Sequence, residues 1–550
     1  MSIRITRSSV ATVHGVAALT VAAALAGSAA PGTADAFCGF YVSGSSEQLT
    51  NKATRVALMR SGQRTVLTMS NDYSGPPQDF AMVVPVPVVL QQENVRTLAH
   101  DVFARIEALT APRLVEYWEQ DPCYQPPDTM LGSTRSFSTS RSGGSSGSIG
   151  GGGLGVRIEA RFAVGEYQIL ILSATQSSGL ETWLRQNRYN IPTGASAALA
   201  PYVREGMKFF VARVDIGRVQ RTPEGGARLS PLRFHYDTQD FRLPVRLGLL
   251  NAPEKQDLIV YVLHPTSRFE VANYPNVFVP TNLDLDPSMR RQFGRFYTTL
   301  FDRTLERMNG RAVVTEYSWA TSSCDPCPTP PLSPSDLATL GADVIDPSNN
   351  AQPTGAMPGR WAGRRPMSGG GGMNVTRLHT RYNAQTLNAD LVFREAGPIV
   401  GGREHVVDAQ TQALEQGAQP AQSGGNNFQA RYAIRHPWRG PIRCRNPQRG
   451  VWGGPPAGTS AQPVRPALDL VSRTGAAIEL PRVVRTAVPE LGIAGVQRNA
   501  RAQTTPSGTT APRRAQPKMS SGSSKLAAGS LGILAALALV ARRLASSKKR

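Results

Sequence analysis

Alternating apolar and polar positions run through much of the chain between residues 37 and 452, and they favour short strands. The clearest early pair is Arg55–Met59 and Thr65–Ser70, which flank Ser61-Gly62-Gln63, a sequence typical of a hairpin turn. Further strand candidates share this alternation or an unbroken apolar character: Val156–Phe162, Tyr167–Ser173, Phe209–Ile216, Leu232–Tyr236, Leu258–His264, Thr376–Tyr382 and Ala389–Arg394. The pattern predicts a strand-rich fold.

Helical spacing of apolar residues occurs in fewer segments. It is visible in Asn94–Glu119, where Pro112 is expected to break the helix or to start a second one carrying Leu114, Tyr117 and Trp118. The other helix candidates are Leu180–Arg188, Ala195–Glu205 and Pro287–Asn309.

Tracts rich in Gly, Ser and Pro divide the chain. Residues 138–155 are nearly pure Ser and Gly, and residues 328–372 are rich in Pro, Gly and Ser, so both are expected to be flexible inserts. Residues 453–524 are rich in Pro, Ala, Arg and Thr and predict a stalk, with one apolar island, Ile478–Ile493, able to dock on the domain. The expected fold is α+β: one composite, strand-rich domain over residues 37–452, interrupted by two disordered inserts.

The N-terminus has the three parts of a bacterial secretion signal. Two arginines precede an apolar core, Val10–Ala26, and Ala34-Asp35-Ala36 supplies small residues for cleavage. Residues 1–36 are therefore expected to be removed, so that the mature chain begins at Phe37. A retained membrane helix is the alternative, which the Gly and Ser content of the segment disfavours.

Residues 525–550 predict a transmembrane anchor with a basic cytoplasmic tail. Leu526–Val540 is apolar apart from Ser530, and five basic residues follow it. A helix of this length covers only about 22 Å of the roughly 30 Å hydrocarbon core, so the flanking basic side chains would have to extend toward the headgroups. Basic residues after the helix place that end in the cytoplasm and the domain outside. A sorting tail that is removed by a protease is the alternative.

The formal net charge of +21 at first points to a nucleic-acid-binding protein. More than half of this excess lies in residues 1–36 and 453–550, which are predicted to lie outside the folded domain. Because a nucleic-acid-binding protein concentrates positive charge on a folded surface, the distribution argues against a nucleic-acid partner.

Three groups of motifs carry a resemblance to a known family. They are Phe37-Cys38-Gly39-Phe40-Tyr41-Val42, Gly75-Pro76-Pro77 with the run Asp79–Pro87, and Ala111-Pro112-Arg113-Leu114 with Asp121-Pro122-Cys123. With these, residues 37–395 resemble the bacterial domain-of-unknown-function family 2330. A further similar segment stands at Arg435-His436-Pro437-Trp438. The family has no assigned activity, so the resemblance implies an exported bacterial envelope protein and supplies no catalytic residues.

Cysteine is the most informative residue type for chemistry. The candidates for structural disulfides are Cys38, Cys123, Cys324, Cys327 and Cys444, an odd number that leaves one cysteine over. Cys324-Asp325-Pro326-Cys327 has the spacing of a thioredoxin-like redox motif, in which a helix N-terminus lowers the thiol pKa. The prolines at 328, 330 and 331 exclude such a helix. The pair is therefore predicted to be a structural disulfide, with redox activity as the alternative.

Other catalytic and metal-binding motifs are not recognised. The six histidines of the mature chain have no metal-binding or catalytic spacing. The single Gly-x-Ser-x-Gly match, Gly143–Gly147, lies in the Ser/Gly tract and lacks the strand and helix that such a nucleophile requires. No catalytic residue, metal ion or cofactor is therefore predicted.

The segment Phe428–Trp452 is the best candidate for ligand binding. It interleaves arginines with aromatic rings, a combination that holds polyanions or sugars through guanidinium groups and flat faces. The candidate residues are Arg431, Tyr432, Arg435, His436, Trp438 and Trp452. In the alternative interpretation, which we favour, the aromatic residues anchor a last loop to the domain and the arginines are solvated.

Two hypotheses about function result. The first is a membrane-anchored envelope protein whose domain outside the cytoplasm binds or scaffolds envelope components, such as a polyanion or polysaccharide. The second is an envelope enzyme, acting on thiols and disulfides or by hydrolysis, with a site assembled from distant residues. A cleft with converging acids, histidines or thiols would favour the second, and aromatic or basic surface patches would favour the first.

Overall fold

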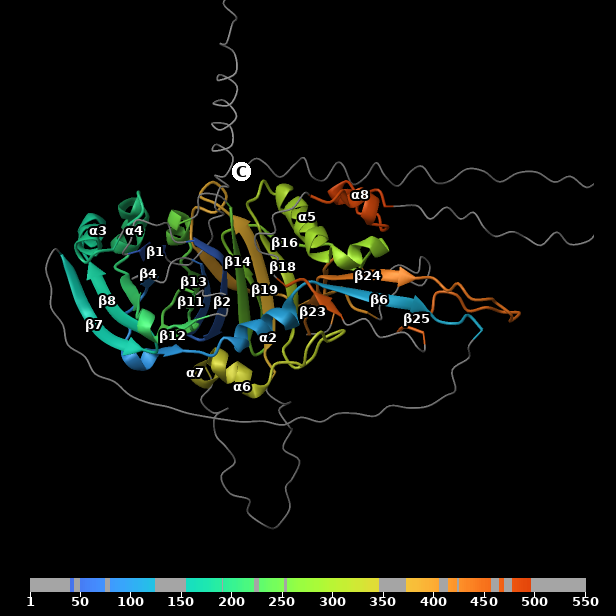
Figure 1. Ribbon diagram of the computed structural model, residues 1–550, viewed down its shortest axis with the longest axis horizontal. Helices are drawn as coiled ribbons and strands as arrows, with labels where there is room; N and C mark the ends of the chain where they lie inside the picture. The colour runs from blue at the N-terminus through green and yellow to red at the C-terminus, as the bar shows by residue number, and fades with distance from the viewer. Residues whose placement is uncertain are drawn as a thin grey trace, which may run out of the picture. The chain divides into compact units, whose positions relative to one another are not determined.

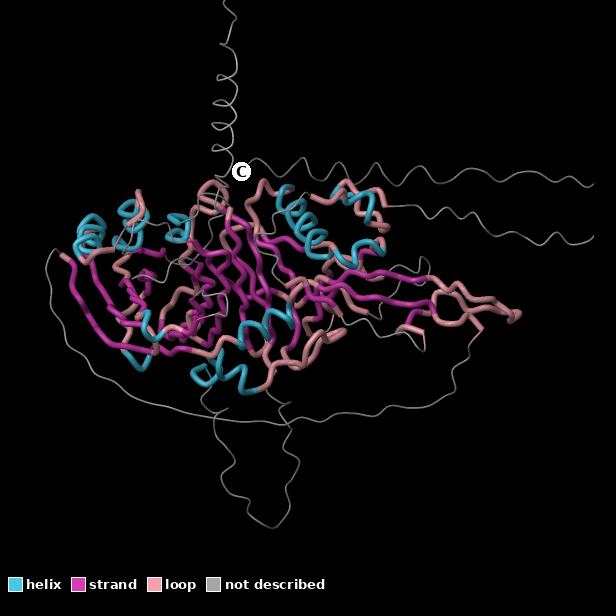
Figure 2. The backbone as a smooth tube through the Cα atoms, viewed as in Figure 1, coloured by secondary structure: helices cyan, strands magenta, loops and turns pink. Residues whose placement is uncertain are grey.

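The computed structural model describes residues 40–43, 50–74, 80–123, 155–189, 191–221, 227–251, 255–345, 372–404, 414–422, 425–456, 464–468 and 477–495. Strands far outweigh helices among them (Figure 2). The predicted secretion signal, Cys38 and the predicted C-terminal anchor lie outside the described residues. Within the described ranges, no helix has the length and apolar character needed to cross a membrane.

An 11-stranded mixed sheet forms the centre of the folded part (Figure 1). Across the sheet, its strands are β22 (Gln419–Pro420), β21 (Ile399–Gly401), β23 (Asn427–Gln429), β18 (Val313–Ala320), β19 (Asn374–Tyr382), β14 (Gln256–His264), β2 (Thr50–Ser61), β3 (Arg64–Ser74), β12 (Leu232–Asp237) and β5 (Val95–Thr97), with β16 (Asn276–Phe278) beside β18. The predicted hairpin is confirmed as β2 and β3. Its turn residue Gly62 has φ 56°, a left-handed conformation that side chains disfavour.

A second, five-stranded sheet packs on one face of the main sheet. Its strands in order are β1 (Phe40–Ser43), β4 (Phe80–Val86), β9 (Lys208–Val214), β8 (Tyr167–Ala174) and β7 (Val156–Val164). Alternate residues of both sheets, such as Leu258 and Ile169, meet in one core because side chains of a strand point to opposite faces in turn. The outer face of the second sheet is covered by α3 (Ser177–Gln186) and α4 (Ala195–Arg204).

Helices cover the other face of the main sheet. Apolar side chains of α2 (Asp101–Thr110) and α6 (Pro334–Leu337) pack on Ile259 and its neighbours there. The amphipathic helix α5 (Phe293–Glu306) lies over β18 and β19, where Phe301 stacks on the His379 ring at 4.1 Å between centroids. The main sheet is therefore buried on both faces.

A third sheet, also five-stranded, contains the Arg/aromatic segment. Its strands are β17 (Leu283–Asp284), β24 (Arg431–His436), β6 (Arg113–Glu119) and β25 (Trp452–Gly453), with β26 (Arg465–Pro466) beside β6. β6 and β24 are parallel, with Arg113 opposite Arg431 and Trp118 opposite His436. A disulfide between Cys123 and Cys444 joins the segments that follow the two strands. Smaller ladders pair β13 (Arg242–Leu243), β20 (Leu391–Ala396) and β15 (Arg268–Val271), and β10 (Gln220–Arg221) with β11 (Ala227–Arg228).

Parts of the predicted stalk and of one predicted insert belong to the folded part. β26 lies within the predicted stalk and pairs with β6. The apolar island Ile478–Ile493, with α8 (Leu480–Val483), packs against α5 through Leu480, Val484 and other buried residues. Residues 328–345, the start of a predicted insert, contain α6 and α7 (Asp343–Ile345). Ser333 caps α6 and Pro334 occupies its first turn, which explains a helix inside a Pro/Ser-rich stretch.

Most predicted elements are confirmed. The strand candidates from residue 156 onward lie within two residues of observed strands, and the helix candidates at 180, 195 and 287 correspond to α3, α4 and α5, the last preceded by a 3₁₀ turn at Pro287–Arg291. The α+β, strand-rich character is confirmed for the described residues.

The predicted helix around Leu114, Tyr117 and Trp118 is wrong, because these residues form strand β6. The helix predicted over Asn94–Glu119 is limited to Asp101–Thr110. Short apolar runs fit a helix or a strand equally well by periodicity. The strand is selected here by β24, which pairs with β6 from Arg113 to Trp118.

Candidate functional site

Three basic side chains of β19, Arg377, His379 and Arg381, lie on the helix-covered face of the main sheet, because alternate residues of a strand share a face. The side chains of Arg377 and His379 are 0% and 1% exposed. A buried charge is costly unless it is paired. The acids around these residues therefore decide what the cluster can do.

Each of the three basic residues meets two carboxylates from other elements. The pairs are Arg377–Glu107 (3.0 Å), Arg377–Glu316 (2.5 Å), His379–Glu316 (2.8 Å), His379–Asp257 (2.9 Å), Arg381–Asp257 (3.0 Å) and Arg381–Asp302 (2.7 Å). Together these seven residues form a row of alternating charges from α2 to α5, which we call the β19 charge row. It links α2 and α5 to the sheet.

The charges in the row shift each other's pKa values strongly. Burial alone would raise the pKa of Glu316, but the positive charges of His379 and Arg377 outweigh it and lower the pKa to about 2. Burial alone would lower the pKa of His379, but Glu316 and Asp257 raise it to about 9. Glu316 is therefore ionised and His379 protonated at neutral pH.

The part of the β19 charge row from Glu107 to Asp257 is buried, whereas at its other end the Asp302 side chain is 43% exposed. Each of its buried carboxylates is held by at least one basic side chain. A cavity of about 640 Å³ lies beside Asp302 and Arg381, between α5 and the docked segment at residues 477–493. Among the described residues, no group of three or more His, Cys, Asp or Glu side chains has the arrangement of a metal site.

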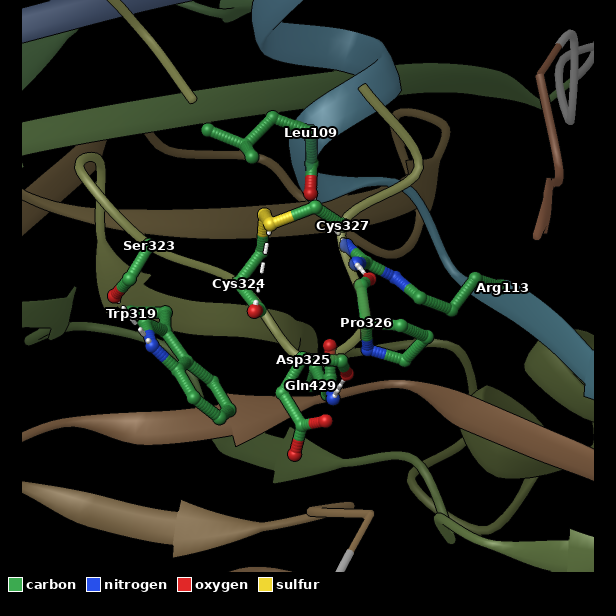
Figure 3. The surroundings of a disulfide bond; sticks show 9 residues. All are labelled: Leu109, Arg113, Trp319, Ser323, Cys324, Asp325, Pro326, Cys327 and Gln429. Atoms are coloured by element: carbon green, nitrogen blue, oxygen red, sulfur yellow. Dashed lines mark hydrogen bonds between the residues drawn. A yellow bond between two sulfur atoms is a disulfide. The ribbon is translucent and has the colours of Figure 1, made fainter. Parts of the chain in front are cut away.

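The cysteine pair Cys324 and Cys327 forms a disulfide in a loop at the end of β18 (Figure 3). Cys327 is exposed and Cys324 is half-buried. No helix begins at Cys324, as the prolines predicted; the next helix, α6, starts at Pro334. We call residues 324–327 the Cys324 loop.

The Cys324 loop is held by other parts of the fold. Gln429 of β23 donates a hydrogen bond to the Asp325 carbonyl, and the Glu404 amide donates to the Asp325 carboxylate at 2.8 Å. Arg113 of β6 donates from Nη1 to the Pro326 carbonyl at 2.8 Å (Figure 3). Three elements distant in sequence therefore fix the loop.

Arg113 is an unusual neighbour for a disulfide. Its residue is 0% exposed, its Nη2 donates to the Leu109 carbonyl and its guanidinium lies over the Tyr317 ring. No described carboxylate lies within ion-pair distance of it. Burial lowers the pKa of Arg113, and the negative charge of Asp325 opposes this. A guanidinium charge thus lies beneath the Cys324 loop without a salt bridge.

The residues predicted to bind a ligand do not form one patch. Arg431 and Tyr432 are both 0% exposed. Arg431 is used internally, donating to Asn282 at 2.8 Å and to the Tyr117 hydroxyl at 2.6 Å. Tyr432 packs in the core beneath α5. These two side chains stabilise the fold and are inaccessible to a ligand.

The other four predicted residues are partly exposed and lie near the end of the third sheet. Arg435 pairs with Asp284 and lies over the Trp452 ring, 5.3 Å from its centroid. On the opposite face of β24, His436 stacks on the Trp118 ring and is 2.9 Å from Glu116, and the Trp438 amide donates to Glu119. His436 and Trp452 thus pack against other side chains at the end of the sheet. The favoured interpretation also expected solvated arginines, whereas Arg431 is buried.

A basic loop, residues 437–451, extends beyond these anchors. Arg439, Arg443 and Arg445 are exposed, and residues 437–451 contain no acid. Ile442 and Val451 of this loop are 44% and 49% exposed, the highest values among the large apolar side chains of the described residues.

The basic loop is fixed at both ends. The Glu119 carboxylate, 4% exposed, accepts hydrogen bonds from the Trp438 and Gly450 amides at 2.9 Å each and pairs with Arg449. The Cys123–Cys444 disulfide fixes its middle. The arginines are thus displayed on a rigid support.

Comparison with known families assigns the chain. A sequence profile of DUF2330, described as an uncharacterized protein conserved in bacteria, matches residues 32–394. The chain belongs to the DUF2330 family. Comparisons with curated proteins and with solved structures gave no match. The DUF2330 match includes the Cys324 loop and every residue of the β19 charge row, and it ends before the basic loop.

Sequence reasoning missed Arg113 and the β19 charge row. One signal was present: Arg377, His379 and Arg381 occupy alternate positions of a segment predicted as a strand. Alternate charges on a strand usually mark a solvated face. Only the helices above that face show that the charges are buried. Arg113 carried no such signal within the DUF2330 motif that contains it.

Proposed function

We propose that this DUF2330 protein is exported, is held in the cytoplasmic membrane by its C-terminal segment, and binds an anionic polymer of the cell envelope. The first two parts rest on the secretion signal and the apolar C-terminal segment of the sequence. Two disulfides support them, because disulfides persist in oxidising compartments outside the cytoplasm.

The binding part of the proposal rests on the basic loop. Arg439, Arg443 and Arg445 are exposed and have no acid within the loop, so their guanidinium groups are free to meet phosphate or carboxylate groups. Ile442 and Val451 add apolar contact area for the carbon skeleton of a polymer. Because Glu119 and the disulfide already fix the loop, little conformational entropy is lost on binding.

Replacing Arg439, Arg443 and Arg445 together by glutamine is expected to weaken binding to polyglycerol phosphate by at least about tenfold, because each guanidinium contact to an anionic surface contributes on the order of 1 kcal/mol. Affinity is measured by isothermal titration calorimetry on the mature domain. The matched control replaces Arg161, Arg204 and Arg218, exposed arginines remote from this loop in sequence, and should leave the affinity unchanged.

Three other ligands and a change of salt concentration test the specificity of binding. Neutral dextran should not bind, and raising the salt concentration should weaken binding because charges are screened. Equal loss of affinity in both triple variants would reduce the effect to net charge and refute the role of the loop. Tighter binding to anionic phospholipid vesicles or to double-stranded DNA than to polyglycerol phosphate would replace the proposed ligand class.

The topology has its own test. Protease added to bacterial spheroplasts is expected to digest the domain and to leave a small C-terminal fragment in the membrane. An epitope tag after Arg550 should remain protected until the membrane is permeabilised, since the basic tail is predicted to lie in the cytoplasm. Protection of the whole chain would exclude export.

A further inference from the structure

We infer that the Cys324–Cys327 disulfide is a reversible redox site that exchanges with a dithiol partner, and that it is not a staple of the fold. The inference is independent of polymer binding by the basic loop. A redox role differs from the structural role that the sequence predicted for this disulfide. It rests on three features of the tertiary structure: the supports of the loop, its access from solvent and a buried charge next to it.

The first feature is that the Cys324 loop does not need its disulfide. A disulfide stabilises a fold mainly by closing a long loop in the unfolded chain, and this one closes a ring with a sequence separation of only 3. The loop is already fixed by Arg113, Gln429 and the Glu404 amide, all of which bind its carbonyl or carboxylate groups. The dithiol form therefore retains the same supports as the disulfide form.

The second feature is access from solvent. Cys327 is exposed, whereas Cys324 is half-buried against the core that contains Ile106 and Leu109. Thiol–disulfide exchange requires in-line attack by a thiolate on one sulfur of the disulfide. The exposed Cys327 is therefore the sulfur that a partner thiolate attacks. The half-buried Cys324 is the leaving group.

The third feature is a positive charge beneath the loop. In thioredoxin-like sites, a helix N-terminus stabilises the thiolate. No helix begins at Cys324, but Arg113 places a buried guanidinium at the carbonyl of Pro326, the residue that precedes Cys327 (Figure 3). Asp325, in the loop itself, opposes this effect with its negative charge. A cation next to a thiol favours the thiolate, which makes it a better leaving group.

The reaction balances with a dithiol as the co-reactant. A partner thiolate attacks Cys327 Sγ, the Cys324–Cys327 bond breaks, and Cys324 leaves as a thiolate that takes a proton from solvent. The second thiol of the partner, as its thiolate, then attacks the mixed disulfide and releases Cys327, which is also protonated. Two electrons and two protons pass to this chain, and the partner becomes a disulfide. The reverse sequence oxidises a dithiol.

The test compares the two disulfides of the same molecule. The mature, folded domain is treated with dithiothreitol or a reduced dithiol protein, alkylated at intervals and analysed by mass spectrometry. Cys324–Cys327 is expected to be reduced at least about tenfold faster than Cys123–Cys444, with circular dichroism and melting temperature nearly unchanged. Reduction of both pairs at one rate, or only upon unfolding, would overturn the inference.

Two substitutions of opposite sign test the role of charge. Asp325→Asn keeps an acceptor for the Glu404 amide and removes a negative charge, so alkylation of the reduced pair should reach its half-maximal rate at lower pH. Arg113→Met should move that pH upward. Gln429→Leu, which removes a support of the loop but no charge, is the matched control. An unchanged pH profile in Asp325→Asn would overturn the role of charge even if Arg113→Met fails to fold.

Discussion

Replacing Arg377 by methionine is expected to destabilise the folded part by about 3–5 kcal/mol, the usual cost of removing one partner from a buried ion pair. Arg377 is fully buried between Glu107 and Glu316, and it also contacts the Tyr261 and Thr110 hydroxyls. Methionine fills most of the space but leaves two buried carboxylates with one fewer cation. Urea denaturation of the disulfide-bonded mature domain, followed by tryptophan fluorescence, measures the change.

The matched control is Arg394→Met, which removes an exposed arginine paired with Glu270. The Arg394 side chain is 58% exposed, and such a surface pair contributes at most about 1 kcal/mol. A loss of less than about 1 kcal/mol in Arg377→Met as well would show that the β19 charge row is dispensable for stability. Its burial would then need another explanation.

Stability is expected to fall as the pH rises from about 6.5 through 9. The folded state raises the pKa of His379 from 6.5 to about 9, because Glu316 and Asp257 favour its protonated form over the opposing effect of burial. A raised folded-state pKa gives stability that is complete below 6.5 and is lost as the pH passes 9. A shift of this size corresponds to on the order of 3 kcal/mol.

At acid pH, stability is expected to fall as the pH decreases. Glu316 has a folded-state pKa of about 2, lowered by His379 and Arg377 from 4.5. Its contribution is therefore present above 4.5 and is lost as the pH falls toward 2. Burial lowers the pKa values of His235 and His264. Deprotonation of these two histidines therefore does not contribute to the loss of stability expected above pH 6.5.

The variant His379→Gln tests whether His379 causes the fall in stability between pH 6.5 and 9. It keeps hydrogen-bonding capacity between Glu316 and Asp257 but cannot be protonated, so the fall in stability between pH 6.5 and 9 should flatten. Chemical denaturation at several pH values gives both curves. An equal fall in stability between pH 6.5 and 9 in the variant would assign the pH dependence to groups other than His379. The control is His264→Gln, a half-buried histidine outside the β19 charge row.

The sequence predicted the secondary structure correctly where length, composition and periodicity favoured one element type. β8 and β14 are short segments rich in apolar and β-branched side chains, and this length and composition favour a strand over a helix. α5 has apolar residues on one stripe and polar residues on the other, which fits only a helix. β6 satisfied both patterns, and its conformation was decided by pairing with β24, over three hundred residues later.

The candidate sites were less readable, because burial cannot be deduced from residue type. Arg431 and Arg439 look alike in the sequence, yet one is enclosed beside Asn282 and the other is exposed on the basic loop. Likewise, the sequence offered the Cys324–Cys327 spacing and the prolines that exclude a helix. It could not show that Arg113, over two hundred residues earlier, lies beneath that loop.

The sequence alone thus determined the DUF2330 family, the strand-rich α+β character and the disulfide spacing of Cys324 and Cys327, because these depend on local periodicity and short motifs. The tertiary structure alone decided which charges are buried, which arginines face solvent and which cysteine pairs with Cys123. Those properties depend on contacts between residues hundreds of positions apart, and such contacts arise only when the sheets and helices pack together.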